Sequence, residues 1–227
     1  MAWTNLFVRA QALKREAVIA IIDYGMGNLR SVQKAFEKLG FQAKITDNPD
    51  DLNNAEKLVL PGVGAFKDAK DGLEQRGLIE PILTSINSGK PFLGICLGLQ
   101  LLFTKSMENG EHDGLNLIPG KVVRFCSGKT DTNVCPTIKI PHIGWNQIFL
   151  KKDVPILKGI PSDTYMYFVH SYYVCPEEET DIATETDYGT RFTSMVWREN
   201  IFATQFHPEK SQKHGLTILK NFAELPF

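Results

Sequence analysis

The sequence lacks several features that mark secreted, membrane-bound and nucleic-acid-binding proteins. It holds only four cysteines in 227 residues and no Cys-x-x-Cys pair, so neither a disulfide scaffold nor the usual zinc-ligand spacing is present. Its 25 basic and 26 acidic residues nearly cancel, so no overall field attracts nucleic acid or an anionic membrane. No apolar run approaches the roughly 20 residues of a membrane helix. These absences predict a cytoplasmic protein with no metal, no organic cofactor, no nucleic-acid partner and no membrane partner.

The first residues also lack the apolar core of a signal peptide, because Arg9, Lys14 and Arg15 interrupt it. We interpret residues 1–16 as an N-terminal extension and residues 17–227 as one domain. With 43% hydrophobic and 22% charged residues, the chain has the composition of a single soluble α/β domain with a well-buried core.

Apolar runs and helix-period stretches alternate through the first half of the chain, which is typical of βαβ units and a mostly parallel sheet. The strands expected there are residues 18–22, 43–45, 58–60 and 91–95. The helices expected there are residues 31–39 and 78–87, with a further helical stretch at 99–103. The second half predicts an antiparallel extension and a last helix, with strands at 121–125, 165–174, 192–197 and 201–205 and the helix at 215–223.

A strand-to-helix turn carries one of the four cysteines. Residues 94–98 read GICLG, with Cys96 flanked by a glycine two positions away on either side. Such a sharp turn brings the flanking residues together, so both positions tolerate little more than hydrogen. Cys96 is then placed at a helix N-terminus, whose dipole favours the thiolate, and we interpret it as a nucleophile. The cysteines without this setting, interpreted as small buried apolar residues, are Cys126, Cys135 and Cys175.

A thiol nucleophile needs a base, and His207 is the candidate. It lies in the sequence QFHPE at residues 205–209, where Pro208 disfavours helix and keeps His207 extended at the end of a strand. Alternation along an extended segment places His207 and Glu209 on roughly the same side. The strand directs His207 to the sheet edge that carries Cys96, so the three residues form a candidate catalytic triad. On this pattern alone, a structural histidine is an equally good interpretation.

Acyl transfer also needs N–H donors aimed at the oxygen that becomes negative. The turn after Cys96 supplies the backbone N–H of Leu97. The loop PGVG at residues 61–64 is a candidate for a second donor, because its glycines allow a peptide to turn toward a substrate. Taken alone, this tetrad favours an ordinary βα turn.

Six motifs in this order resemble the triad (class I) glutamine amidotransferases, and most closely the glutaminase subunits of imidazole glycerol phosphate synthases. The resemblance runs from about residue 17 to the end of the chain. The motifs are DYGMGNL at 23–29, LPGVGAF at 60–66, GICLGLQ at 94–100, PHIGWN at 141–146, YFVHSY at 167–172 and QFHPEK at 205–210.

The resemblance implies a flavodoxin-like three-layer sandwich with a mostly parallel central sheet and an antiparallel β extension. The catalytic triad that it implies is Cys96, His207 and Glu209. The oxyanion donors that it implies are the amides of Val63 and Leu97. The glutamine-binding residues that it implies are Gly62, Gly64, Gln100, Glu108, Ser171 and Tyr172. The residues expected to face a partner protein are Asn28, Trp145, Tyr167, His170 and Lys210.

The family activity is hydrolysis of glutamine to glutamate and ammonia. The resemblance implies a heterodimer in which the ammonia passes to a (β/α)₈-barrel cyclase, which makes imidazole glycerol phosphate and aminoimidazole carboxamide ribonucleotide in histidine biosynthesis. Such a glutaminase is expected to be nearly silent alone, with the loop at residues 61–64 as a switch.

Three alternatives stay open on the sequence. A paralogous glutaminase supplies ammonia to a sugar amidotransferase in surface polysaccharide synthesis, and the insert at residues 126–135 departs from the plainest family pattern. A catalytically inactive interaction subunit on the same fold and a cysteine peptidase are the others. The triad and the expected glutamine-site residues argue against these last two.

Overall fold

The computed structural model describes residues 18–126, 128 and 137–227. The predicted extension at 1–16 lies outside the described residues, as does the insert at 126–135 except for residues 126 and 128.

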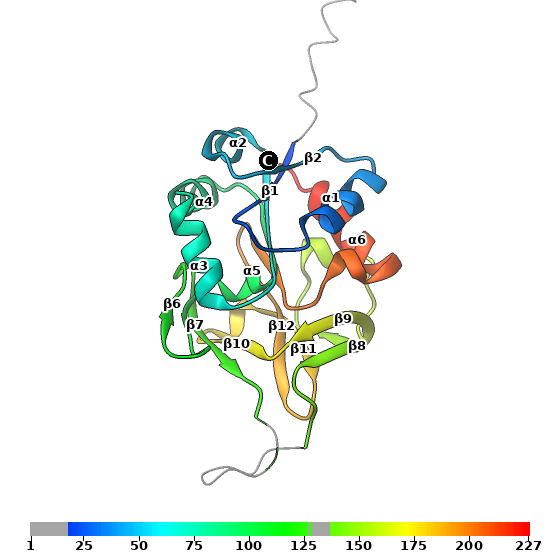
Figure 1. Cartoon of the computed structure of the whole chain (residues 1–227). Helices are drawn as coiled ribbons and strands as arrows, with labels where there is room; N and C mark the ends of the chain where they lie inside the picture. The colour runs from blue at the N-terminus through cyan, green and yellow to red at the C-terminus, as the bar shows by residue number, and fades with distance from the viewer. Residues whose placement is uncertain (1–17, 127, 129–136) are drawn as a thin grey trace, which may run out of the picture.

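Five parallel strands form the centre of the molecule (Figure 1). In spatial order they are β2 (Ala43–Thr46), β1 (Ile19–Ile22), β3 (Lys57–Gly62), β4 (Phe92–Cys96) and β13 (Ile201–Thr204). Counted along the chain, this is the order 2-1-3-4-5 of flavodoxin-like sheets. Every residue of β1, β3, β4 and β13 is buried, as expected for parallel strands that are covered on both faces.

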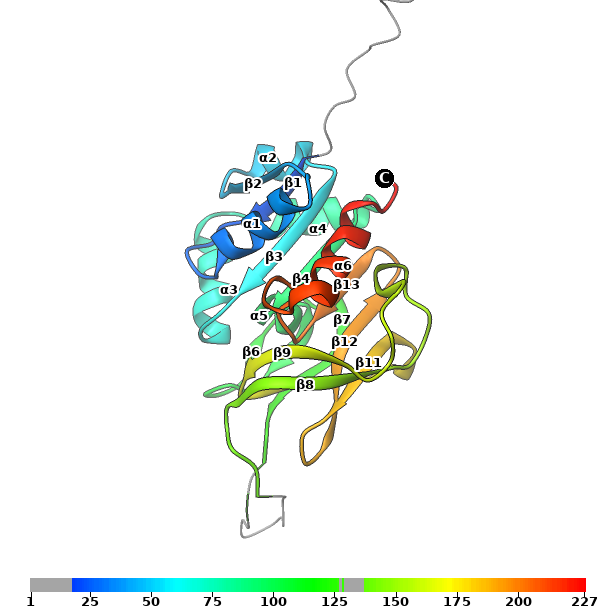
Figure 2. The same cartoon turned by 90° about the vertical axis from the view of Figure 1, so that its right-hand side faces the viewer.

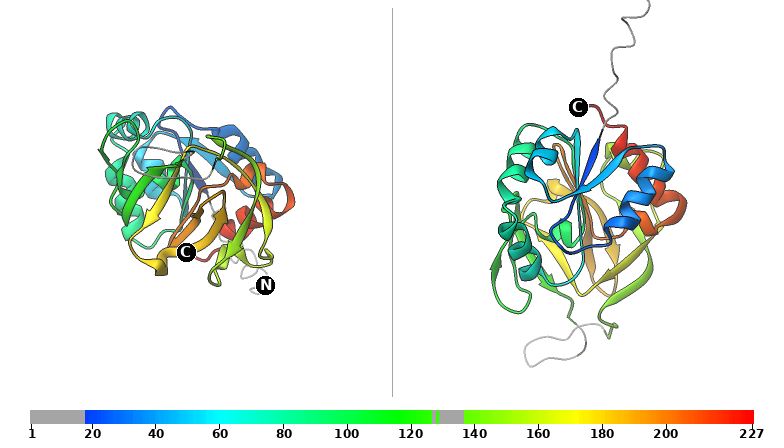
Figure 3. Two further views of the ribbon diagram at one scale, coloured as in Figure 1. Left: turned by 90° about the horizontal axis from the view of Figure 1, so that it is seen from below. Right: turned by 45° about the horizontal axis from the view of Figure 1, so that its top comes forward.

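Helices cover both faces of this parallel sheet, which gives three layers (Figures 1 and 3). On one face lie α1 (Leu29–Lys38) and α6 (Gln212–Ala223), whose Phe36 and Phe222 rings are 6.5 Å apart. The other face is covered by α2 (Pro49–Asn54), α3 (Phe66–Gln75) and α4 (Ile79–Asn87). Each layer packs one side of β1, because Ile19 and Ile21 face one core while Ala20 and Ile22 face the other.

The sheet continues beyond β13 as a mainly antiparallel extension (Figure 2). Its strands, in spatial order, are β12 (Arg191–Arg198), β10 (Tyr172–Pro176), β7 (Ile118–Arg124), β5 (Phe103–Ser106) and β6 (His112–Asp113). A side branch is formed by β11 (Ile182–Asp187), β8 (His142–Leu150) and β9 (Thr164–His170). The branch ends in the antiparallel β8–β9 hairpin, which lies below the carboxyl ends of the parallel strands in Figure 2.

The fold class predicted from the sequence is confirmed: a parallel central sheet, helices on both faces and an antiparallel extension. Several local predictions were wrong. The helix expected at 99–103 is only the short α5 (Leu97–Gln100), and the chain then enters β5. The strand expected at 165–174 divides at Ser171 into β9 and β10, which pair with different partners.

Other elements were not predicted from the sequence. They are the strands β5, β6, β8 and β11, the helices α2 and α3, and the short 3₁₀ turns η1 (Pro155–Leu157), η2 (Glu179–Asp181) and η3 (Pro208–Lys210). Helix α3 buries Phe66, Ala69 and Leu73 at helical spacing among five charged residues and a glycine, so a periodic signal was present and was missed.

The cysteines outside the turn also differ from expectation. Cys126 is exposed and disulfide-bonded, so its interpretation as a buried apolar residue was wrong. Cys175 is free and half-buried, and Cys135 lies outside the described residues. Within the part of the chain that the structure describes, no helix is long and apolar enough to cross a membrane.

Candidate active site

Cys96 ends strand β4 and directly precedes helix α5, in a strained conformation with a φ of 57°. A non-glycine residue in this region costs about 1–3 kcal/mol, so the surrounding structure must impose it. The flanking glycines show how the surrounding structure imposes this conformation on Cys96. A Cβ on Gly98 would lie 1.8 Å from the Leu60 carbonyl oxygen, and one on Gly94 would lie 2.8 Å from the Gly98 carbonyl oxygen. The close packing of β3, β4 and α5 thus lifts the Cys96 side chain out of the sheet, as the sequence pattern predicted.

His207 lies beyond the carboxyl end of β13, the parallel neighbour of β4. Its backbone is extended, and its Nδ1–H donates to Oε1 of Glu209 over 2.8 Å. The two side chains are almost completely buried, with 2% and 1% of their surface exposed. The geometry differs from the expected alternation, because Pro208 starts the 3₁₀ turn η3. That turn, rather than an extended segment, brings Glu209 back to His207.

The His207 ring is poised toward Cys96. Its Nε2 is buried and has no hydrogen-bond partner among the described residues. Burial acts to lower the pKa of His207, but the neighbouring Cys96 sulfur and the Glu209 carboxylate outweigh it and raise the pKa to about 10. A ring with this pKa holds a proton at neutral pH and carries it next to the sulfur.

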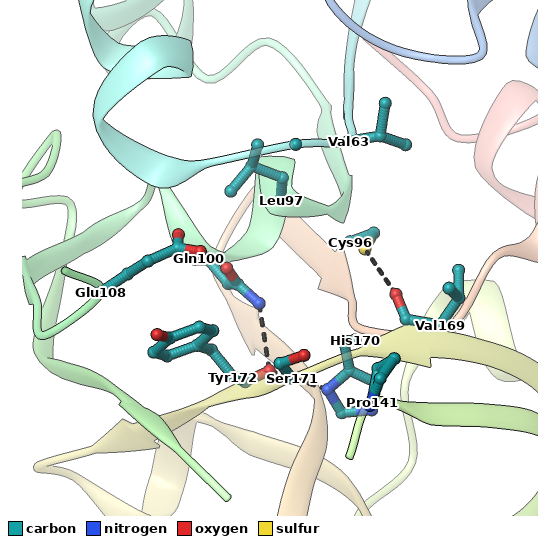
Figure 4. Close-up of a pocket in the computed structure, with 11 residues that line it drawn as sticks. Val63, Cys96, Leu97, Gln100, Glu108, Pro141, Val169, His170, Ser171 and Tyr172 are labelled. Carbon is teal, nitrogen blue, oxygen red and sulfur yellow. Dashed lines mark hydrogen bonds between the residues drawn. The ribbon is translucent and has the colours of Figure 1, made fainter.

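A cavity of about 280 Å³ opens in front of Cys96 (Figure 4). Eight of the residues expected at the site line it: Val63, Gly64, Cys96, Leu97, Gln100, Glu108, Ser171 and Tyr172. The remaining lining residues are Pro141, Val169 and His170. Gly62, His207 and Glu209 are not part of the lining. The cavity therefore joins segments from β3, β4, β9 and β10 at the carboxyl edge of the parallel sheet.

Two polar side chains in the cavity are fixed by hydrogen bonds to the backbone. Gln100 Nε2 donates to the Tyr172 carbonyl over 3.2 Å, which leaves the Gln100 Oε1 to accept from a ligand. Glu108 Oε2 accepts the Phe66 backbone N–H over 2.7 Å, at the start of α3. The Cys96 thiol faces the Val169 carbonyl at 3.9 Å. A fixed carboxylate and a fixed amide oxygen suit a ligand that carries both an ammonium and an amide.

The two candidate oxyanion residues lie side by side above the cavity in Figure 4. Gly62 at the end of β3 is paired with Cys96, so Val63 follows directly beside the nucleophile. Leu97 is the first residue of α5. A Cβ on Gly62 would lie 2.4 Å from the Tyr24 hydroxyl, so this position requires glycine for the loop to pack against Tyr24.

The residues expected to face a partner are only partly grouped. Trp145, 45% exposed, makes an edge-to-face contact with Tyr167 at 6.0 Å, and Lys210 lies over the Tyr167 ring at 5.8 Å. Asn28 is half-buried at the N-terminus of α1 and accepts the Ser31 hydroxyl over 2.8 Å. His170 is largely buried, with 6% of its surface exposed, but it lines the cavity, and its contact with a partner stays a prediction. Strand alternation explains this burial, because His170 shares the inner face of β9 with Met166 and Phe168.

Sequence reasoning missed other groups at this site. Gln205 lies against the Cys96 sulfur, and His142 forms a hydrogen bond with His170 beside the cavity. Gln205 lies in the motif QFHPEK and His142 in the motif PHIGWN, so the sequence could have indicated both. Ile143 and Tyr165, 59% and 56% exposed, enlarge the apolar outer face of the β8–β9 hairpin. Among the described residues, no group of His, Cys, Asp or Glu has the arrangement of a metal site.

The doubly wound sheet, the strained cysteine and the buried His–Glu pair define a class: an α/β protein whose site is built for acyl transfer through sulfur. The chain belongs to the glutamine amidotransferase class-I family, whose model matches residues 20–225. It is 58% identical over 208 residues to the imidazole glycerol phosphate synthase subunit HisH of Syntrophotalea carbinolica, covering 92% of this chain and 100% of that relative. The HisH subunit of Geobacter metallireducens is 56% identical, with 91% of this chain and 98% of the relative covered.

Solved structures with low sequence identity share the fold. PurLQS from Thermotoga maritima matches with a TM-score of 0.70 at 16% identity, over 91% of this chain and 97% of that one. A glutamine amidotransferase from the same organism matches with a TM-score of 0.59 at 16% identity, over 86% of this chain and 76% of that one.

Proposed function

We propose that this chain is the glutaminase subunit of an imidazole glycerol phosphate synthase. It hydrolyses glutamine to glutamate and ammonia and passes the ammonia to a (β/α)₈-barrel cyclase subunit in the cytoplasm. The cyclase then makes imidazole glycerol phosphate and aminoimidazole carboxamide ribonucleotide for histidine biosynthesis. The observation that carries the proposal is the strained Cys96 beside the buried His207–Glu209 pair, at a cavity that presents Gln100 and Glu108.

In the first half-reaction, His207 has taken the proton of the Cys96 thiol, and the resulting thiolate attacks the side-chain amide carbon of glutamine. The carbonyl electrons move to oxygen, where the Val63 and Leu97 N–H groups stabilise the negative charge. As the C–N bond breaks, His207 gives its proton to the leaving nitrogen and ammonia departs. The raised pKa of His207, about 10, supports this role because the donor is charged before the substrate arrives.

In the second half-reaction, water hydrolyses the thioester. His207, now neutral, takes a proton from the attacking water, and the C–S bond breaks to release glutamate and return the electron pair to sulfur. Glu209 holds the imidazole through Nδ1 and stabilises its charged form, as the 2.8 Å hydrogen bond between them supports.

The outer face of the β8–β9 hairpin is the proposed contact surface for the cyclase. It presents Trp145, Tyr165 and Ile143 next to the active-site edge of the sheet. Aromatic side chains that keep much of their surface exposed in the free chain are typical centres of protein interfaces. The adjacent loop at residues 61–64 links this surface to the reaction, because a turn of its peptide adds or withdraws the Val63 donor.

The test is glutamate release by the purified chain, alone and with the cyclase and its nucleotide substrate. We expect weak hydrolysis alone and stimulation of at least about 100-fold, the usual effect of one oxyanion donor. Cys96→Ala should abolish both activities and provides the background. Full activity of the chain alone would contradict the switch.

The same assay separates the alternatives. Stimulation by a sugar amidotransferase instead of the cyclase would assign the chain to polysaccharide synthesis. An inactive interaction subunit would show no labelling of Cys96 by a glutamine-like electrophile in the assembled complex. Cleavage of peptides rather than glutamine would identify a peptidase.

A further inference from the structure

Gln205 is a completely buried amide that contacts the nucleophile. It follows β13 directly, and its Nε2 lies 3.6 Å from Sγ of Cys96, within hydrogen-bonding range for sulfur. His207, two residues further on, approaches the same sulfur. The half-reactions of glutamine hydrolysis give Gln205 no role, although burying a primary amide is costly unless its polar atoms are used.

The direction of the Gln205 amide is fixed by its neighbours. The Tyr172 carbonyl can only accept, so the Gln100 atom that contacts it at 3.2 Å must be the donor Nε2. That same nitrogen lies 3.1 Å from Gln205, whose contacting atom must therefore be the acceptor Oε1. The nitrogen of Gln205 is left to face the Cys96 sulfur. The Tyr172 carbonyl thus fixes the orientation of the Gln100 amide, which in turn fixes that of the Gln205 amide. As a result, an N–H donor faces the Cys96 sulfur.

This short chain of hydrogen bonds is well anchored. The Tyr172 carbonyl also accepts from Nδ1 of His170 over 2.7 Å, and the Gln205 backbone N–H donates to the Ser194 carbonyl over 2.9 Å. Gln100 and Gln205 are 5% and 0% exposed, so water does not compete for these bonds. The donor is therefore held in place before the reaction begins, which is the condition for electrostatic stabilisation in an active site.

We propose that Gln205 is a positioning residue that holds the Cys96 sulfur and favours its anionic form. The neutral thiol has an acceptor in the Val169 carbonyl at 3.9 Å, whereas the thiolate has a donor in the Gln205 amide. When the thioester intermediate collapses, the C–S bond breaks and the electron pair returns to sulfur. The Gln205 N–H lies where that charge develops, and it keeps the sulfur aligned for the next attack.

Other titratable groups also surround the Cys96 sulfur, and none of them is removed when Gln205 is substituted. Those that face the Cys96 sulfur or its cavity are His207 and Glu209 beyond β13, Tyr24 beyond β1, His170 in β9, Tyr172 in β10 and Glu108 beyond β5. Burial, and then the Cys96 sulfur, raise the pKa of Tyr24, so its phenol stays neutral. Burial lowers the pKa of His170 to about 3, so its ring is also neutral in an assay near pH 7. Substitution of Gln205 leaves all of these groups in place.

The test compares two substitutions in the full chain. Gln205→Glu keeps an oxygen that accepts from Gln100 but places a second oxygen, not a donor, against the sulfur. Gln205→Met keeps the approximate length and removes both polar atoms. For Gln205→Met we expect the midpoint of the pH profile of Cys96 alkylation by iodoacetamide to move up by about one pH unit, the effect of one hydrogen bond to a charged group. For Gln205→Glu we expect a larger upward move, because its carboxylate also repels the thiolate.

The matched control is Gln147→Glu, which changes the same residue type on the β8–β9 hairpin, where its amide donates to the Asp163 carbonyl over 3.1 Å. Its alkylation profile should equal that of the wild type. An unchanged profile in a folded Gln205→Met chain would overturn the proposal, with folding judged by circular dichroism and thermal unfolding.

The kinetic part rests on the proposed function, whereas the alkylation profile does not, so the two ideas fail separately. In the stimulated complex, Gln205→Glu should lower kcat about tenfold and change KM for glutamine little, because Gln100 stays anchored. A raised KM with unchanged kcat would show that Gln205 only supports the glutamine pocket. A normal alkylation shift in a complex that does not hydrolyse glutamine would reject the glutaminase and keep the positioning role.

Discussion

At the scale of the residue, Glu108 has two tasks. It accepts the Phe66 N–H at the start of α3, and it presents its carboxylate to the cavity in front of Cys96. In the proposed function, this carboxylate binds the ammonium of free glutamine, a group that an amide within a protein chain lacks. The proposed role of Glu108 therefore separates a glutaminase from a peptidase more sharply than the triad does.

Glu108→Gln should raise KM for glutamine by about 10- to 100-fold and change kcat much less, because a hydrogen bond to a charged group contributes about 1.5–3 kcal/mol. The new amide oxygen still accepts the Phe66 N–H, so α3 keeps its contact. Steady-state kinetics of the stimulated complex measure the effect. Glu111→Gln is the matched control, since Glu111 is exposed and pairs with Lys105 away from the cavity. Equal KM values for the two variants would remove Glu108 from the glutamine site.

At the scale of the element, the β8–β9 hairpin carries a buried histidine pair on its inner face. His142 and His170 lie opposite each other in the register, and Nδ1 of His142 is 3.0 Å from Nε2 of His170. The ring of His142 is stacked between Phe168 and Tyr188, at 4.9 and 3.9 Å. Burial lowers the pKa values of His142 and His170 to about 4 and about 3.

This pair makes the protein sensitive to acid. Between about pH 6.5 and pH 4 the unfolded chain binds protons at both histidines, whereas the folded chain does not. The free energy of unfolding therefore falls as the pH falls, by about 1.4 kcal/mol per pH unit for each histidine. In the His142→Gln variant, the free energy of unfolding should depend less steeply on pH, by about 1.4 kcal/mol per pH unit, because one of the two histidines is removed. Urea unfolding at several pH values from 7 to 4.5 measures it, and parallel curves for the variant and the wild type would contradict the assignment.

At the scale of the whole molecule, the reactive edge and the apolar hairpin lie on one side, while the carboxyl terminus lies at the opposite end (Figure 1). A partner seated on the hairpin covers the cavity side of the sheet without touching the terminus. The arrangement supports direct transfer of ammonia, because β9 lines the cavity in front of Cys96 and also forms part of the hairpin that carries the proposed contact surface.

Trp145→Ala should weaken binding of the cyclase by about 30-fold, which corresponds to about 2 kcal/mol for an aromatic residue at the centre of an interface. Isothermal titration calorimetry measures the change in Kd. Phe227→Ala is the control, because Phe227 is 62% exposed at the far end of the molecule. A similar loss of affinity in the control, or none in Trp145→Ala, would place the interface elsewhere.

The sequence by itself determined the local parts of this protein. The turn around Cys96 follows from two glycines that leave no room for a Cβ, and the His207–Glu209 contact spans only two residues. Sterics and short-range hydrogen bonds act within a few residues, so such parts are encoded where they stand. The alternating apolar runs likewise predicted the parallel layer, because each strand must bury both faces.

Only the tertiary structure decided which distant residues meet. Parallel pairing of β4 with β13 brings Cys96 to Gln205 across 109 positions of sequence, and the division of the chain at Ser171 sets the Tyr172 carbonyl beside Gln100. It also turned His170 inward, onto the face of β9 that carries Met166 and Phe168. These contacts depend on the register and packing of the whole sheet, a balance of many small energies that no short motif contains.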